Sequence, residues 1–235
     1  MTTIGLIGGM SWESTAVYYR LLNEGVRERA GGLHSADILL HSLDFAPIAE
    51  MQAAGDWASA GAALAESARR LERAGARCIL LATNTMHKVA DAITAATNVP
   101  FLHLADVTAK AVRKAGGSRP LLLATRFTME QEFYRGRLAA FGVEAMVPEP
   151  EERAEIHRII YEELCRGVVS PTSRERYREI IRGAIARGAD GVILGCTEIG
   201  LLIGQQDASV PVFDTTALHV EAALELMVVD HRAAA

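Results

Sequence analysis

A chain of 235 residues, half of them hydrophobic, is long enough to bury a substantial core as one domain or two small ones. Its formal net charge of -5 at pH 7 provides no basic surface for a polyanion, which argues against nucleic-acid binding and favours small-molecule chemistry. Its three cysteines form no CxxC pair, and no apolar run approaches the roughly 18 residues of a membrane span. We therefore expect a cytoplasmic protein without disulfides, a metal site or a membrane partner.

The first half of the chain predicts strands that alternate with helices. Strands are expected at residues 4–8, 38–40, 78–81 and 99–101. Helices are expected after Ser11, from residue 58 to residue 74, and from the end of the strand at 99–101 to residue 112. The glycines in and directly after the first strand are spaced Gly-x-x-Gly-Gly, whereas a dinucleotide site needs G-x-G-x-x-G, so no nicotinamide or flavin cofactor is expected there. This alternation is typical of an α/β fold with a mainly parallel sheet.

The second half starts afresh after Gly116-Gly117-Ser118, which mark the expected boundary between two lobes. A strand is predicted at 120–125, and a helix with a Thr172-x-x-Glu175 capping box ends at Gly188. This helix leads into Val192-Ile193-Leu194, a short apolar run that is typical of a buried parallel strand.

Two parts of the chain resemble each other. Residues 75–85 repeat the pattern of residues 188–198, and residues 99–103 further on correspond to residues 210–214. A helix-like run follows in both cases. Two matched segments in the same order indicate duplicated half-chains, with chance similarity between two α/β units as the alternative explanation.

Cys196 follows the predicted strand at 192–194, at the carboxyl end where ligands bind in open α/β sheets. In the repeat, Thr83 occupies the matching position. A helix that begins after Cys196 would favour the thiolate through its free amide groups and its positive end. We therefore interpret Cys196 as a reactive residue. Cys78 and Cys165 are instead expected to be core or helix-face thiols, because free cysteine is among the most buried residue types.

Three motifs in combination resemble the cofactor-independent aspartate/glutamate racemases. They are Gly8-Gly9-Met10-Ser11-Trp12-Glu13-Ser14-Thr15, Thr83-Asn84-Thr85-Met86-His87 and Gly195-Cys196-Thr197-Glu198-Ile199-Gly200. The similarity runs through nearly the whole chain and includes residues 44–45, 55–57, 125–129 and 210–214. Each motif alone is weak, whereas their combination is specific.

The resemblance implies two similar pseudo-symmetric α/β lobes, each a mainly parallel sheet flanked by helices, with the active site in the cleft between them. We expect residues 1–117 and 213–235 in the N-terminal lobe and residues 118–212 in the C-terminal lobe. The last helix should pack on the first lobe, and residues 233–235 should fray. The resemblance also implies a small amino-acid substrate, no cofactor and no metal, and it allows a homodimer.

In the racemases that the chain resembles, two cysteines face each other across the α-carbon of the substrate. One removes the α-proton, and the other returns a proton on the opposite face. Cys196 matches the second cysteine, whereas Thr83 stands in place of the first, as in a subset of similar proteins. A hydroxyl does not titrate near neutral pH, so Thr83 is a poor base, but it can still give a proton to a carbanion-like intermediate. The resemblance therefore implies an isomerase of aspartate or glutamate that favours the L-substrate.

The resemblance also assigns residues to substrate binding. Backbone amides around Asn84-Thr85 and Thr197-Glu198 would hold the α-carboxylate, because strand-to-helix turns present free N–H groups to anions. Arg126 and Arg166 are candidates for the distal carboxylate, and His87 is expected to support the turn of its own motif. The matched substrate positions are Met10, Gln52, Asn84, Thr85, Thr125, Thr197 and Glu198.

Two other functions remain open at this point. Related enzymes of the same broad superfamily isomerise or decarboxylate small diacids at similar paired sites, although the motif from Thr83 to His87 argues against them. An amino-acid-binding module without catalysis would also explain the replacement of the first cysteine. Measured turnover separates an enzyme from a module that only binds.

Overall fold

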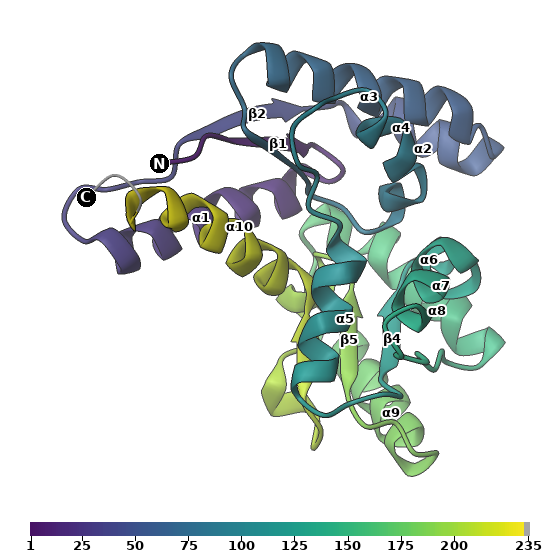
Figure 1. Ribbon diagram of the computed structural model, residues 1–235. Coiled ribbons are helices and arrows are strands. Elements are labelled where there is room, and N and C mark those ends of the chain that lie inside the picture. The colour runs from purple at the N-terminus through teal and green to yellow at the C-terminus, as the bar shows by residue number, and fades with distance from the viewer. Residues whose placement is uncertain (233–235) are drawn as a thin grey trace. The chain divides into compact units, whose positions relative to one another are not determined.

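The computed structural model describes residues 1–232, with side chains described through residue 227 (Figure 1). The chain forms two compact units. The first contains residues 1–103 and the C-terminal helix from residue 219, and the second contains residues 104–218. The fraying expected at residues 233–235 concerns positions outside this description. In the described part of the chain, no helix is both long enough and apolar enough to cross a membrane.

The first unit is built on a parallel three-stranded sheet with the order β2-β1-β3. Strand β1 (Ile4–Gly8) lies between β2 (Ile38–Ser42) and β3 (Cys78–Leu81). Strands β1 and β3 are buried along their whole length, as parallel strands covered on both faces should be, whereas the edge strand β2 is partly exposed. A single bridge between Ile79 and Phe101 stands where a strand was expected at 99–101.

Helices cover both faces of this sheet. Ile4 and Leu6 share one core cluster with α1 (Trp12–Ala30) and α10 (Thr215–Arg232), and Ile7 shares another with α3 (Trp57–Arg73). Successive strand residues point to opposite faces, so one strand supplies both clusters. From residue 219 onward, α10 belongs to the first unit. The unit also contains α2 (Phe45–Ala54), the 3-10 helix η1 (Thr85–Val89) and α4 (Ala90–Thr94).

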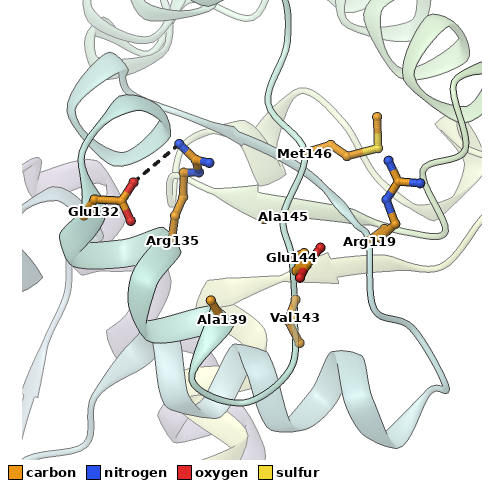
Figure 2. A pocket seen from close by; sticks show the side chains of 8 residues that line it. All are labelled: Arg119, Glu132, Arg135, Ala139, Val143, Glu144, Ala145 and Met146. Atoms are coloured by element: carbon orange, nitrogen blue, oxygen red, sulfur yellow. Dashed lines mark ion pairs between the residues drawn. The ribbon is translucent and has the colours of Figure 1, made fainter.

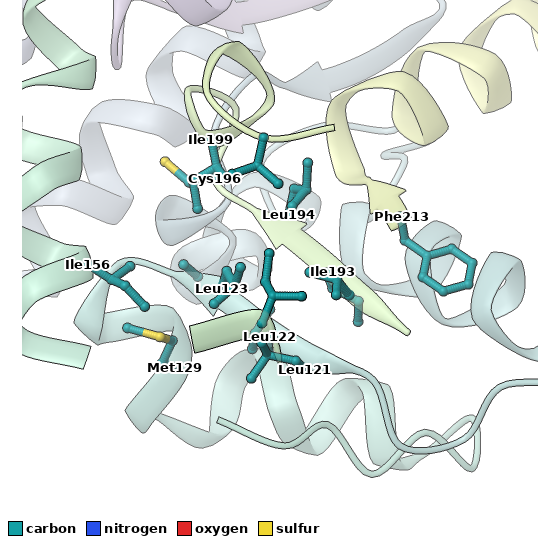
Figure 3. Close-up of a cluster of buried hydrophobic side chains, with 14 of the residues drawn as sticks. Leu121, Leu122, Leu123, Met129, Ile156, Ile193, Leu194, Cys196, Ile199 and Phe213 are labelled. Atoms are coloured by element: carbon teal, nitrogen blue, oxygen red, sulfur yellow. The ribbon is translucent and has the colours of Figure 1, made fainter. Parts of the chain in front are cut away.

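The second unit has a parallel sheet with the order β4-β5-β6. Its strands are β4 (Leu121–Ala124), β5 (Val192–Gly195) and β6 (Val212–Asp214). Figure 3 shows the three leucines of β4 beside Ile193 of β5, with Met129 and Ile156 in the same buried cluster. The surrounding helices are α5 (Leu104–Lys114), α6 (Arg126–Glu130), α7 (Glu132–Ala139), α8 (Pro150–Glu162), α9 (Pro171–Ala186) and the 3-10 helices η2 (Leu164–Arg166), η3 (Ile199–Leu201) and η4 (Gln205–Asp207).

The boundary between the units lies at other residues than the sequence suggests. We expected residues 104–117 in the first lobe, but Leu104, Ala109 and Val112 of α5 are buried in the core of the second unit. Residues 213–218 also belong to the second unit, because β6 pairs with β5. The glycines at 116 and 117 therefore end α5 and separate no units.

Helix α9 begins before the expected capping box. Ser170 is its N-cap, and Pro171 occupies the first helical position, which suits the fixed φ of proline. Thr172 and Glu175 consequently lie inside the helix, where Glu175 forms an ion pair with Arg178 instead of a cap. The capping-box prediction is therefore wrong.

Both units repeat the turn that joins a helix to a strand. Gly75 and Gly188 follow α3 and α9 with φ values of 107° and 97°, which only glycine adopts without strain. The next residue in each unit, Ala76 or Ala189, donates its N–H at 3.0 Å to a carbonyl five residues earlier in the chain. The matching sequence segments thus form matching turns.

The sheet edges repeat as well. The N–H of Ile79 binds the carbonyl of Pro100 at 2.8 Å, and the N–H of Val192 binds the carbonyl of Pro211 at 2.9 Å. In the first unit the order across the sheet is β2, β1, β3 and then the bridge at Phe101. In the second unit the order is the bridge at Met146, then β4, β5 and β6. In both units, the segment that comes second in the chain lies at one edge, followed across the sheet by the first, third and fourth segments. This shared order supports the duplication inferred from the sequence.

Candidate active site

Cys196 lies directly after β5, at the carboxyl edge of the second sheet. Gly195, the last residue of β5, lies so close to β4 that an added Cβ would be 2.7 Å from Leu122 Cδ1 and 3.0 Å from Ala124 Cβ. A glycine is therefore needed just before the cysteine. Thr125 follows the neighbouring strand β4, so it lies at the same edge of the sheet.

The chain after Cys196 does not enter an α-helix. Thr197 and Glu198 lead into η3, a 3-10 helix of three residues, and Cys196 is only 9% exposed. The positive helix end expected behind the cysteine is therefore replaced by one short turn. This difference removes one of the two reasons for expecting a thiolate.

The Cys196 thiol donates a hydrogen bond to the carboxylate of Glu198, with 2.9 Å between Sγ and Oε2. The same oxygen accepts the hydroxyl of Thr197 at 2.7 Å. Burial, and then the negative charge of Glu198 and the nearby Cys165, raise the pKa of the Cys196 thiol well above its ordinary value. The expectation of a lowered pKa is therefore wrong. The cysteine rests as a thiol, and a carboxylate is in position to take its proton.

Cys165, which sequence reasoning assigned to the core or a helix face, also faces Glu198. It lies in η2, with 3.7 Å between its Sγ and Oε1 of Glu198. Tyr161 and Tyr177 lie near Cys196, and burial above all raises the pKa of both phenols, which stay neutral. No spacing motif links Cys165 to Cys196, so only the folded chain shows that they share a partner.

Thr83 occupies the equivalent place in the first unit, just beyond the end of β3. Its carbonyl oxygen accepts a hydrogen bond from Nδ1 of His87 at 2.8 Å. The residue is buried, and its hydroxyl forms no hydrogen bond with any residue of the described chain. Because no base contacts this hydroxyl, the geometry agrees with the expectation that Thr83 is a poor proton acceptor.

Three buried histidines, His87, His103 and His219, lie close together, and His87 binds the turn that follows Thr83. The ring centroid of His87 is 4.7 Å from that of His103, 6.0 Å from that of His219 and 5.6 Å from that of Phe101. Among the described residues, no group of three side chains is placed to hold a metal ion. The prediction that His87 supports its own turn is confirmed by its bond to the Thr83 carbonyl.

The other predicted residues of the first unit follow strand ends or contact this turn. Met10 follows β1, Asn84 directly precedes η1, and Thr85 is the first residue of η1. Gln52 comes from α2 and donates from Nε2 to Sδ of Met86 at 3.0 Å. All five residues are buried. Gln52 thus contacts the turn that contains Asn84 and Thr85, and Met10 belongs to the same core cluster as Met86.

The cationic residues that could bind a distal carboxylate are more exposed than the other predicted site residues. Arg126 begins α6 and Arg166 ends η2, and both residues are exposed. Lys88, which the sequence analysis missed, lies in η1 with its Nζ 3.9 Å from the ring centroid of Trp57, and burial lowers the pKa of its ammonium. Its position next to His87 was the only signal in the sequence.

A separate hollow of about 320 Å³ lies in the second unit (Figure 2). Figure 2 shows Glu132 and Arg135 of α7 on one side, and Arg119, Glu144 and Met146 on the other. None of the predicted site residues lines it. Two arginines and two glutamates give it a mixed charge, and we do not include it in the candidate active site because no predicted site residue lines it.

Known proteins similar to this chain agree with the fold. Among solved structures, a candidate Asp/Glu racemase from Yersinia pestis is 53% identical with a TM-score of 0.90, covering 97% of this chain and 100% of that chain. An aspartate racemase homologue from Pyrococcus horikoshii OT3 is 38% identical with a TM-score of 0.84, covering 96% and 99%. The broad specificity amino-acid racemase RacX from Bacillus subtilis is 22% identical over 220 residues, covering 91% and 93%.

Fold and relatives define an α/β isomerase built from two similar units. The sequence matches the family described as Asp/Glu/Hydantoin racemase over residues 7–223, which is most of its length. The chain belongs to this family.

Proposed function

We propose that the protein is a cofactor-independent racemase that inverts the α-carbon of aspartate or glutamate. The observation that carries the proposal is the buried Cys196 thiol, 2.9 Å from the Glu198 carboxylate, in a chain of the racemase family. Removal of an α-proton needs a base poised out of bulk water, and a thiol with its own proton acceptor supplies one. The racemases among the relatives support an amino acid as substrate.

The first proposed step generates the thiolate. The proton of the Cys196 thiol passes to Oε2 of Glu198, which leaves a thiolate and a neutral carboxylic acid. Because the total charge of the buried pair does not change, this transfer avoids adding a second negative charge to a buried site. The thiolate then removes the α-proton of the L-substrate, and the electron pair of the C–H bond stays on the α-carbon.

Thr83 supplies the proton on the opposite face in this mechanism. Its hydroxyl gives a proton to the carbanion-like intermediate, which is a strong base, and the resulting alkoxide takes a proton from water. The proton that Glu198 holds then neutralises the hydroxide left behind, which returns Cys196, Glu198 and Thr83 to their starting states. In the reverse direction Thr83 has to remove the α-proton of the D-substrate, and its hydroxyl has no base as a partner within the described residues. We therefore propose that the α-proton of the L-substrate exchanges faster than that of the D-substrate.

Substrate binding completes the proposal. The amides around Asn84, Thr85, Thr197 and Glu198 would bind the α-carboxylate. The side chains of Met10, Gln52 and Thr125 would orient the rest of the substrate, with Lys88, Arg126 and Arg166 as candidate partners of the distal carboxylate. A cytoplasmic homodimer also belongs to the proposal, and sedimentation velocity of the purified protein measures the assembly.

Deuterium uptake at the α-carbon tests this function. We expect aspartate or glutamate to gain deuterium in D2O without added pyridoxal phosphate, nicotinamide or metal. Cys196→Ser should lower the uptake by roughly a hundredfold or more, because a hydroxyl replaces the competent base. Cys78→Ser, which changes a buried cysteine of the first unit, is the matched control and should retain the uptake. Full activity in Cys196→Ser, or activity that a chelator removes and a metal restores, would overturn the mechanism.

A non-catalytic amino-acid-binding module is the second candidate. It is favoured by the absence of a base at the Thr83 hydroxyl within the described chain. Calorimetry that detects binding of aspartate or glutamate, together with no deuterium uptake for either enantiomer, would support it over a racemase.

A further inference from the structure

We propose that Cys165 is a positioning residue that binds one oxygen of the Glu198 carboxylate and thereby limits the transfer of a proton from Cys196 to this carboxylate. The inference rests on the proposed function, because it concerns the same proton transfer. Cys165 is not proposed to touch the substrate. It acts on the carboxylate, and the carboxylate acts on the catalytic thiol.

The geometry places one carboxylate between two thiols. Oε2 of Glu198 accepts the thiol of Cys196 at 2.9 Å and the hydroxyl of Thr197 at 2.7 Å, whereas Oε1 faces the thiol of Cys165 at 3.7 Å. Glu198 is 3% exposed, so these contacts are shielded from water. Each carboxylate oxygen therefore has a thiol on its side.

Two elements bring Cys165 to this position. The 3-10 helix η2 follows α8 after a single residue, and Leu164 beside Cys165 is fully buried in the core of the second unit. The buried leucine fixes η2 against the sheet that carries Cys196. Cys165 is itself partly buried and packs against the same core. Its placement thus depends on core packing and is not a feature of a loose surface turn.

Two phenols lie beside the cluster, together with the carboxylate of Glu163, which forms an ion pair with Arg158. Tyr161 from α8 lies near Cys196, Cys165 and Glu198, and Tyr177 from α9 lies near Cys196 and Glu163. Burial keeps both phenols neutral. The negative charge shared by Glu198 and the two thiols is therefore the charge that decides how the cluster exchanges protons.

A thiol that donates to a carboxylate stabilises the ionised form of that carboxylate. The Cys165 thiol therefore stabilises the negative charge of the Glu198 carboxylate, and this charge opposes the formation of a Cys196 thiolate. Loss of the Cys165 thiol removes this stabilising donor, and Cys196 also loses the direct influence of Cys165 that raises its pKa. Both effects act in the same direction and favour the Cys196 thiolate.

The experiment measures the pH dependence of Cys196 alkylation by iodoacetamide, with each cysteine-containing peptide quantified by mass spectrometry. Cys165→Val keeps the side-chain volume and Cys165→Ala removes it, and both lack the donor. In either variant the alkylation midpoint of Cys196 should move to lower pH by about half a unit to one unit, which corresponds to one hydrogen bond. Cys165→Ser keeps a donor and should retain most of the wild-type midpoint. Cys78→Ala is the matched control, and its midpoint at Cys196 should not change.

An unchanged midpoint in a folded Cys165→Val or Cys165→Ala protein would overturn the proposal. So would a shift in Cys165→Ser as large as in Cys165→Val, because the donor would then be irrelevant. A merely structural role would lower the thermal midpoint without moving the alkylation midpoint. The readout needs no turnover, so it distinguishes failure of this inference from failure of the racemase function, which the deuterium experiment tests on its own.

Discussion

Nδ1 of His87 lies 2.8 Å from the carbonyl oxygen of Thr83. A carbonyl can only accept, so Nδ1 carries the hydrogen and the ring binds the backbone of the turn and not the Thr83 hydroxyl. His87 therefore cannot serve through Nδ1 as a base for Thr83. The arrangement fixes the turn while leaving the hydroxyl available for the substrate.

The His87 contact predicts a difference between two substitutions. His87→Ala should lower the free energy of unfolding by about 1 to 3 kcal/mol, because it leaves a buried carbonyl without its donor. It should also slow α-proton exchange by roughly tenfold or more through misplacement of Thr83. His87→Asn, whose amide can donate in place of Nδ1, should recover part of both losses. Urea unfolding and deuterium uptake measure the two effects.

The exposed His34 provides the control for this comparison, and His34→Ala should change neither quantity. Equal losses in His87→Ala and His87→Asn would mean that the ring stack, and not the Nδ1 donor, holds the turn.

The contact between Cys196 and Glu198 predicts opposite effects of one substitution on two measurements. Glu198→Gln removes a negative charge that raises the pKa of the Cys196 thiol, so alkylation of Cys196 near neutral pH should become faster. Uptake of deuterium by the L-substrate should nevertheless fall by roughly a hundredfold, because an amide cannot take the thiol proton. Glu144→Gln, at an exposed glutamate of the same unit, is the control. Slower alkylation in Glu198→Gln would contradict the assigned electrostatics.

The buried His219 predicts how acid destabilises the protein. Its Nε2 binds the Leu102 carbonyl at 3.0 Å and its Nδ1 binds the Tyr18 hydroxyl at 2.9 Å. Burial, and then the charge of His87, lowers the pKa of His219 to about 3 from an ordinary value of 6.5. Between these two pH values the unfolded chain binds a proton that the folded chain does not. The stability that neutral His219 contributes is therefore present above pH 6.5 and is lost as the pH falls.

For this one group, the free energy of unfolding should fall by up to about 1.4 kcal/mol per pH unit below pH 6.5. His219→Gln should be less stable at neutral pH, since it alters two buried hydrogen bonds, yet it should lose less additional stability between pH 7 and pH 5. Urea midpoints at the two pH values give both quantities. A loss in His219→Gln as steep as in wild type would show that His219 is not responsible.

Much of the fold follows from local sequence. The apolar runs of β1, β3, β4 and β5 are buried parallel strands, and the repeated glycines Gly75 and Gly188 form equivalent turns. The boundary between the two units could not be predicted from the local sequence. Helix α5 is amphipathic and would suit either core, and only its packing assigns Val112 to the second unit.

The sequence predicts those features of the site that depend on where the strands end, and it does not predict the contacts between side chains. The strand ends bring Thr125 and Cys196 to one sheet edge, as the pattern predicts. The pKa direction of Cys196 depends instead on its burial and on the carboxylate two residues later turning back onto Sγ. The contact with Cys165 depends on how η2 packs, and no spacing in the chain encodes it.

The measurement that tests the account most directly is α-proton exchange of each enantiomer, at saturating substrate, in wild type and in Thr83→Cys. Enantiomers have an equilibrium constant of one, so kcat/KM for inversion is equal in both directions, and the asymmetry has to appear in exchange. We expect the L-substrate to gain deuterium faster than it inverts, and roughly tenfold or more faster than the D-substrate does. Thr83→Cys, with a thiol whose pKa is ordinarily about 8.5, should raise exchange of the D-substrate more than that of the L-substrate. Equal exchange of both enantiomers in wild type, with no gain from Thr83→Cys, would contradict the claim that Cys196 is the competent base and Thr83 the weak one.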